Sequence, residues 1–156
     1  MPDGLYERDI LVWSERQGNL LRRIAAGERL NEDVDWPNVI EEVQDVGRSE
    51  LRAVRSLLVQ SMVPLLKLHA WPRNAAAAHW HGEARGFLAS ARRSFSPSMR
   101  QWLDIPDLYA DALYEAGGRS DDTGEPRPFP EACPFVLDDL IASRPDVETL
   151  MAKLGS

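Results

Sequence analysis

The sequence has little cysteine and lacks any long apolar run. Cys133 is the only cysteine among 156 residues, so no disulfide can form within the chain, as is typical of proteins from reducing compartments. No window reaches the roughly 18 uninterrupted apolar residues of a membrane-spanning helix. The opening MPDGLYERD is charged where a signal peptide would become apolar. We therefore expect a cytoplasmic protein without a membrane segment.

The common catalytic signatures are also missing. The sequence contains no glycine-rich phosphate loop, no nucleophile elbow, and neither a Glu-x-x-His nor a His-Glu-x-x-His pattern. These absences argue against the best-known nucleotide-binding proteins, serine hydrolases and zinc or di-metal enzymes. The sequence favours a non-catalytic protein over an enzyme, and it predicts no cofactor.

Charge is distributed unevenly along the chain, whose net charge is -7. Residues 1–47 carry 5 basic and 11 acidic side chains, residues 48–100 carry 9 and 2, and residues 101–156 carry 4 and 12. Two acidic arms thus flank a basic middle segment. The arms are expected to pack against the middle and neutralise it, and the alternative is an exposed basic face that binds an acidic partner.

Nucleic acid is the less favoured partner for the basic segment. Its arginines, which include Arg52, Arg55, Arg92 and Arg93, are spread along the chain and form no cluster, and the protein as a whole is acidic. Another protein, or a second copy of the chain in a homodimer, is the more natural partner.

Hydrophobic periodicity predicts an all-α protein. Apolar residues recur at three- and four-residue steps over residues 5–24, 39–46 and 80–95, and no segment shows the alternation of a strand. We expect one compact domain over residues 1–156, a bundle of about five to seven helices. Asp3 and Asp35 are predicted to start the first two helices and Gly27 to end the first.

A long central helix is predicted to end before Pro72. Its apolar residues from Leu51 to Leu68 cover more than half of the circumference, which indicates contacts on several sides. Gly47 predicts a break or tight kink before this part, and Pro64 predicts a bend within it.

Further helices are predicted after the central one. Asn74 is expected to cap the next helix, Ser96-Pro97-Ser98 to start a short turn, and Pro106 to lie in the first turn of a helix that Gly117-Gly118 closes. A proline-rich loop should follow, exposed at its acidic start and held at Phe129 and Phe135. One or two helices are expected between Val136 and Leu154.

Four polar residues are candidates for a catalytic or metal-binding cleft: Glu42, His69, His79 and Glu83. An antiparallel pair of helices around Trp71-Pro72 could bring His69 near His79, and Glu83 lies one turn after His79. The simpler interpretation is surface histidines, one of them paired with Glu83. Glu42 is next to Glu41, but adjacent helical side chains diverge by about 100°, so a structural salt bridge of Glu42 is favoured over acid–base catalysis.

A few other residues are candidates for binding a partner. Trp36 and Trp71 lie at the edges of predicted helices, where an amphipathic ring can anchor another protein, and Arg92 and Arg93 end a helix. Cys133 has no neighbouring histidine in the sequence and is expected to be a small core residue rather than a nucleophile.

Several blocks together resemble a known family. The segments LYERDILVWSERQGNLLR, NVIEEVQDVGRSELRAVRSLL, LLKL and FPEACPF-x-LDDL occur in the order found in the bacterial family called domain of unknown function 29. The resemblance covers about residues 5–142 and leaves 143–156 as a C-terminal helical extension. It implies a small helical protein without an established reaction or cofactor.

The chain departs from that family pattern at two places. Pro64 stands where the family tends to have histidine before Leu-Leu-Lys, and residues 73–78 replace an Arg-Ser-x-Ser-Trp block. A site built from those polar residues in relatives would be absent here.

Overall fold

The chain is all-α, as predicted. The computed structural model describes residues 3–117 and 124–155, which form helices and connecting loops and contain no strand. The helices are α1 (Leu5–Arg8), α2 (Ile10–Ala25), α3 (Trp36–Ala70), α4 (Ala77–Ser94), α5 (Ile105–Gly117), α6 (Leu137–Leu140) and α7 (Val147–Lys153), with two 3-10 helices, η1 (Asn31–Asp33) and η2 (Pro97–Trp102).

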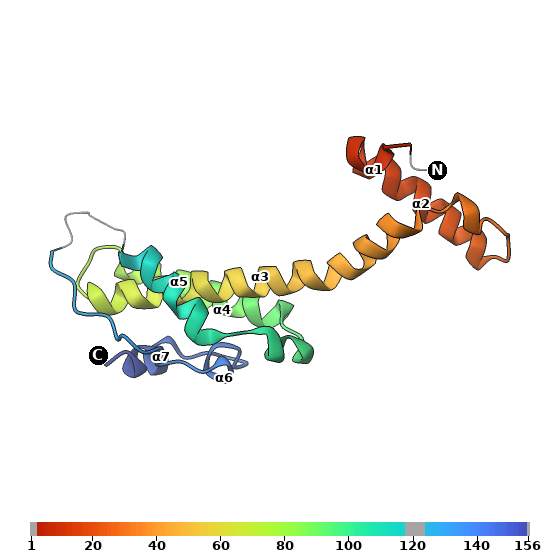
Figure 1. The fold of residues 1–156 in the computed structure, drawn as a ribbon. Helices are drawn as coiled ribbons and strands as arrows, with labels where there is room; N and C mark the ends of the chain where they lie inside the picture. The colour runs from red at the N-terminus through yellow and green to blue at the C-terminus, as the bar shows by residue number, and fades with distance from the viewer. Residues whose placement is uncertain (1–2, 118–123, 156) are drawn as a thin grey trace. The chain divides into compact units, whose positions relative to one another are not determined.

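Where the sequence suggested one domain, the chain divides into two compact units. Unit 1 is Met1–Ser49 and unit 2 is Glu50–Ser156. Unit 1 contains α1, α2, η1 and the start of α3 (Figure 1). The two units are described separately below.

Short polar side chains set the helix boundaries in unit 1. Asp3 is not the predicted cap of α1, because Gly4 occupies the N-cap position; the Asp3 carboxylate lies one residue earlier and accepts a hydrogen bond from the Leu5 N–H at 3.0 Å. Asp9 interrupts the predicted first helix, because its carboxylate accepts from the Val12 N–H at 3.1 Å and starts α2. Gly27, whose φ is +102°, follows the end of α2 as predicted, since glycine adopts this left-handed conformation without strain.

The core of unit 1 is small. Trp13, Val34 and Val39 are its buried apolar residues, and partly buried side chains pack around them: Leu5, Tyr6, Leu20, Leu21 and Ile24. Gln17 is also buried, and its side-chain oxygen accepts from the Asp35 N–H at 2.9 Å. This bond ties α2 to the start of α3.

Helix α3 runs from Trp36 to Ala70, so the predicted break at Gly47 is wrong. One glycine costs a helix about 1 kcal/mol relative to alanine, which the good helix formers on either side of Gly47 outweigh. Pro64 lies inside the helix and has no N–H to donate to the Gln60 carbonyl. The helix ends at Ala70, before Pro72, as predicted.

Unit 2 contains the main hydrophobic core. Val54, Leu58, Met62 and Leu65 of α3 pack with Leu88 and other side chains of α4, and with residues of α5, α6 and α7. Figure 1 shows α4 and α5 alongside the second half of α3. Because Val147, Leu150 and Leu154 are buried in this core, the described part of the C-terminal extension packs in unit 2.

Most predicted helix boundaries in unit 2 are confirmed. Pro97 starts η2, Pro106 lies in the first turn of α5, and α6 and α7 occupy the predicted C-terminal region. Asn74 is not the cap of α4: the helix begins at Ala77, and the Asn74 side chain accepts from the Ala76 N–H instead. Gly118 and the acidic start of the proline-rich loop lie outside the described residues.

The described part of the proline-rich loop is fixed to the helices by hydrogen bonds. Tyr109 donates its hydroxyl to the Pro130 carbonyl at 2.6 Å, and Trp71 donates its indole N–H to the Gly124 carbonyl at 3.0 Å. Phe135 is buried and Phe129 is partly buried, as predicted. Among the described helices, none has the length and apolar character needed to cross a membrane.

Candidate functional site

Glu42 makes a hydrogen bond within unit 1. Its carboxylate accepts a hydrogen bond from the Tyr6 hydroxyl at 2.5 Å. This bond, followed by desolvation and the charge of Glu42, raises the pKa of Tyr6 to about 12. The contact ties the first helical turn to α3, so Glu42 makes a hydrogen bond to tyrosine here and not the predicted salt bridge.

His69 is buried in the last turn of α3. Its Nε2 lies 3.1 Å from the Pro128 carbonyl oxygen, and because a carbonyl only accepts, Nε2 carries the proton. The other nitrogen, Nδ1, is buried and has no hydrogen-bond partner among the described residues. His69 therefore holds the loop near Pro128 against the helix.

His79 and Glu83 form the pair that the sequence predicted. His79 Nε2 lies 3.2 Å from Glu83 Oε1, one turn apart on α4, with the His79 side chain 74% exposed. His81 lies 3.5 Å from Glu148. The described residues contain no group of three or more His, Cys, Asp or Glu side chains placed to hold a metal ion. Of the four residues predicted for a cleft, His79 and Glu83 contact each other, whereas Glu42 contacts Tyr6 and His69 contacts Pro128.

Trp71, which was predicted to bind a partner, is buried. Its side chain packs with Ala70 and Trp80, and its indole N–H donates to the Gly124 carbonyl. Arg92 and Arg93 are exposed in the last turn of α4, where their charge complements the helix dipole. Arg93 donates to the Ser90 hydroxyl at 3.2 Å.

Cys133 behaves as the predicted small apolar residue. It packs against the core of unit 2 and its thiol donates to the Phe135 carbonyl at 3.4 Å. Burial is the main cause that raises the pKa of this thiol, which disfavours the nucleophilic thiolate.

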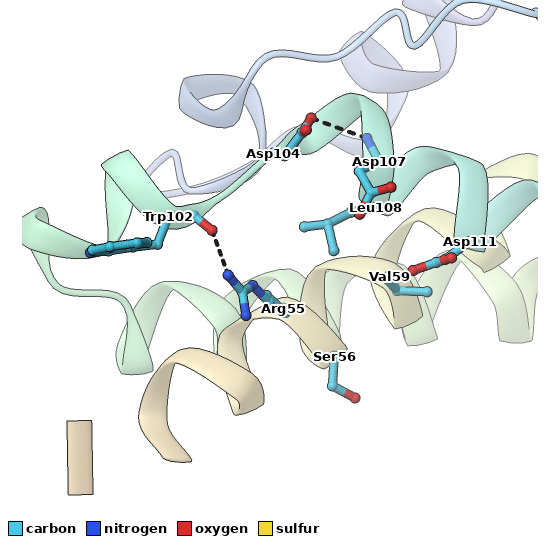
Figure 2. Close-up of a pocket in the computed structure, with 8 residues that line it drawn as sticks. All are labelled: Arg55, Ser56, Val59, Trp102, Asp104, Asp107, Leu108 and Asp111. Atoms are coloured by element: carbon cyan, nitrogen blue, oxygen red, sulfur yellow. Dashed lines mark hydrogen bonds between the residues drawn. The ribbon is translucent and has the colours of Figure 1, made fainter. Parts of the chain in front are cut away.

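A cavity of about 330 Å³ lies in unit 2, between α3, η2 and α5 (Figure 2). Its lining is Arg55, Ser56, Val59, Trp102, Asp104, Asp107, Leu108 and Asp111. Arg55 donates to the Trp102 carbonyl at 2.8 Å, and the Asp104 side chain accepts from the Asp107 N–H at 3.2 Å. The first bond joins η2 to α3, and the second lies at the start of α5.

The chemistry available in this cavity is limited. Ser56 is the one hydroxyl of the lining, and no histidine, lysine or cysteine lines the cavity to activate it as a nucleophile. The three carboxylates give the cavity an acidic wall opposite one arginine. None of the four residues predicted for a catalytic cleft contributes to it.

Unit 1 has an exposed apolar stripe on α3, and the consecutive residues Ile10, Leu11 and Val12 of α2 are also exposed. The stripe on α3 consists of Trp36, Ile40, Val43 and Val46, which are 39%, 52%, 68% and 67% exposed, and is called the α3 stripe below. Val39 on the same helix is buried against Trp13, so α2 covers one edge of the apolar face and leaves the rest in water. Trp36 is held in place because its indole N–H donates to the Asn31 carbonyl at 2.7 Å.

Sequence reasoning identified only part of this surface. The periodicity over residues 39–46 placed Val39, Ile40, Val43 and Val46 on one helical face, but of the four stripe residues only Trp36 was predicted to bind a partner. The acidic wall of the cavity had a signal in the sequence, the three- and four-residue spacing of Asp104, which precedes α5, and of Asp107 and Asp111 within it.

Comparisons with known proteins give a family and a similar structure. Residues 5–144 match the family described as "Domain of unknown function DUF29". An alpha-helical protein of unknown function from Rhodospirillum rubrum ATCC 11170, solved by crystallography, is 26% identical, with a TM-score of 0.69 over 97% of this chain and 98% of that chain. Comparison with curated proteins gives no match.

Proposed function

We propose that this chain, which belongs to the DUF29 family, is a non-catalytic module that binds another protein through the α3 stripe. The observation that carries the proposal is the exposure of four apolar side chains at successive turns of one helix. Neither the family description nor the similar structure assigns a function.

The arrangement of the stripe supports binding rather than accidental exposure. Single exposed apolar residues are common on protein surfaces, but a continuous apolar patch is typical of an interaction site. Trp36 lies at one end of the stripe, and tryptophans with a fixed orientation are frequent anchors at protein interfaces. An apolar helix face with anchors three and four residues apart is also a recurrent way in which proteins recognise helices.

The basic residues offer weaker support for a partner site. In unit 2 the acidic C-terminal arm already contacts the basic middle segment, through the pair of Arg100 with Asp138 at 2.8 Å and that of His81 with Glu148. These contacts agree with partial neutralisation of the basic segment by the arm.

We also propose that the protein acts in the cytoplasm. The single cysteine is a free thiol, which a reducing compartment preserves, and no described helix can span a membrane. Fractionation of the native cells, with the chain detected by antibody, tests this location directly.

Site-specific photo-cross-linking in the native cells tests the function. A photoreactive phenylalanine analogue at Val43 should yield at least one discrete cross-linked protein band, because this side chain lies in the stripe and is 68% exposed. The same analogue at Tyr114, which is 87% exposed in unit 2, is the control and should yield no such band. Equal cross-linking at both positions, or none at Val43, would contradict the proposal.

A further inference from the structure

We infer that the α3 stripe binds the α3 stripe of a second copy of this chain, so that two α3 helices pack antiparallel across a two-fold axis near Val43. This inference rests on the proposed function, because it names the partner of the same surface. Its evidence is the shape, the size and the charge pattern of the stripe.

The stripe has the geometry of a helix–helix seam. At 100° per residue, Trp36, Ile40, Val43 and Val46 fall within an arc of about 120°. Val39 and Gly47 also fall in this arc, so residues 36–47 place no charged side chain in it. Glu50 is the next residue within the arc, and it lies opposite Trp36 of the second copy when the axis is at Val43. The helix rises about 1.5 Å per residue, which makes the uncharged arc roughly 17 Å long.

Gly47 adds a point of close approach. No heavy atom lies within 4 Å of the position that a Cβ at Gly47 would occupy, and the residue is exposed. A second helix can therefore come nearer to the backbone here than beside a larger residue. With the axis at Val43, Val43 meets its own copy and Ile40 lies beside Val46 of the second copy.

The exposed area matches what a small dimer needs. From their exposed fractions, the four side chains leave on the order of 400 Å² of surface in water per copy. Interfaces are about 60% apolar, so this apolar surface corresponds to roughly 700 Å² per partner, near the usual value of about 800 Å². Such an interface is at the weak end of the specific range.

The charges around the stripe do not require a basic partner. Glu41 is paired with Arg48 of its own helix at 2.8 Å, and Glu42 accepts the hydrogen bond of Tyr6. Both glutamates therefore have partners within the chain. A second copy satisfies the remaining requirement, which is cover for an apolar arc, and two-fold pairs of this kind are the commonest form of self-association.

Sedimentation equilibrium of the purified chain between 1 and 300 μM tests the inference. The wild type should change from the 17.6 kDa monomer to twice that mass. Val43→Glu should remain monomeric and weaken self-association at least 30-fold, because it places two carboxylates at the axis. Val136→Glu is the matched control: Val136 is 61% exposed in unit 2, and this variant should dimerise like the wild type.

Disulfide trapping in a Cys133→Ala background tests the antiparallel arrangement. Under oxidising conditions V43C should form a covalent dimer, because the two-fold axis brings the two positions together. V46C should form at least tenfold less, since antiparallel packing separates its two copies by roughly 9 Å along the axis. Equal trapping at both positions would overturn the antiparallel geometry.

The results separate this inference from the proposed function. A wild type that stays monomeric at 300 μM, or a Val43→Glu variant that dimerises like the wild type, overturns the self-association. Cross-linking at Val43 to a different protein in cells would then leave the proposed function standing. Circular dichroism of each variant, with a spectrum like that of the wild type, confirms that it is folded.

Discussion

Replacing Trp13 by phenylalanine should loosen unit 1 and leave unit 2 unchanged. Trp13 is 5% exposed, it packs edge-to-face on Tyr6, and its indole N–H donates to Asp35 Oδ2 at 3.0 Å. Phenylalanine keeps the ring contact with Tyr6 but removes the donor and part of the buried surface. With few other apolar residues in this core, the loss should fall on unit 1 as a whole.

The magnitude follows from two contributions. A hydrogen bond to a carboxylate contributes about 1.5–3 kcal/mol, and the lower value applies because Asp35 is only partly buried and keeps its hydrogen bond from Asn38 at 2.8 Å. The smaller ring buries roughly 40 Å² less surface, which costs about 1 kcal/mol. Together the two contributions should lower the free energy of opening unit 1 by about 2–3 kcal/mol, which raises the equilibrium constant for opening roughly 30- to 150-fold.

Hydrogen exchange measured by mass spectrometry provides the assay. Peptides from α2 and the first turns of α3 should exchange roughly 30- to 150-fold faster in Trp13→Phe, whereas peptides from α4 and α5 should exchange at the wild-type rate. Trp102→Phe is the control, since Trp102 is 60% exposed and its replacement should change neither unit. Equal acceleration in α2 and α5 would refute the reasoning, because the two units would then open together.

Two further predictions concern unit 2. Tyr109→Phe should lower the free energy of unfolding at pH 8 by about 1–2 kcal/mol, through loss of the hydrogen bond to Pro130, and Tyr114→Phe, at an exposed position, should not. Burial raises the pKa of Tyr109 to about 12 in the folded state, against about 10 in the unfolded state, so the stabilisation by Tyr109 is complete below pH 10 and is lost as the pH rises to 12. In urea titrations the difference in the free energy of unfolding between wild type and Tyr109→Phe should shrink over this pH range, and a constant difference would count against this account. His69→Leu should change the free energy of unfolding by less than about 1 kcal/mol, because removal of the unpaired Nδ1 offsets the lost hydrogen bond to Pro128. His69→Ala should lower the free energy of unfolding by more than about 2 kcal/mol in the same urea titration, and similar values for both variants would contradict this account.

Helix positions were predictable because their causes are local. Gly27 and Pro106 act through backbone conformation and a fixed φ within one turn of the chain, and the structure confirms both. The error at Gly47 has the opposite origin. Its low helical propensity is a weak local effect, which the neighbouring residues and the packing of α3 override.

Side-chain partners could not be predicted in the same way. Glu42 bonds to Tyr6, 36 positions earlier, and His69 bonds to Pro128, 59 positions later. Helical spacing relates residues three or four positions apart, so it identified the pair of His79 with Glu83 and missed both long-range contacts. The same limit explains why Trp71 was expected at the surface, although its indole is covered by the loop at Gly124.

The α3 stripe shows most clearly what periodicity does and does not measure. A repeat of apolar residues tells which face of a helix avoids water, but it does not tell what covers that face. Val39 and Val43 are one turn apart on α3, yet Val39 is 9% exposed and Val43 is 68% exposed, since α2 reaches only the first. Ile40, Val43 and Val46 therefore form an apolar surface of unit 1 that is available to a partner. Because a second copy brings an identical uncharged arc of suitable size, self-association satisfies the pattern without any further component, and the mass measurement on Val43→Glu decides whether it does so in solution.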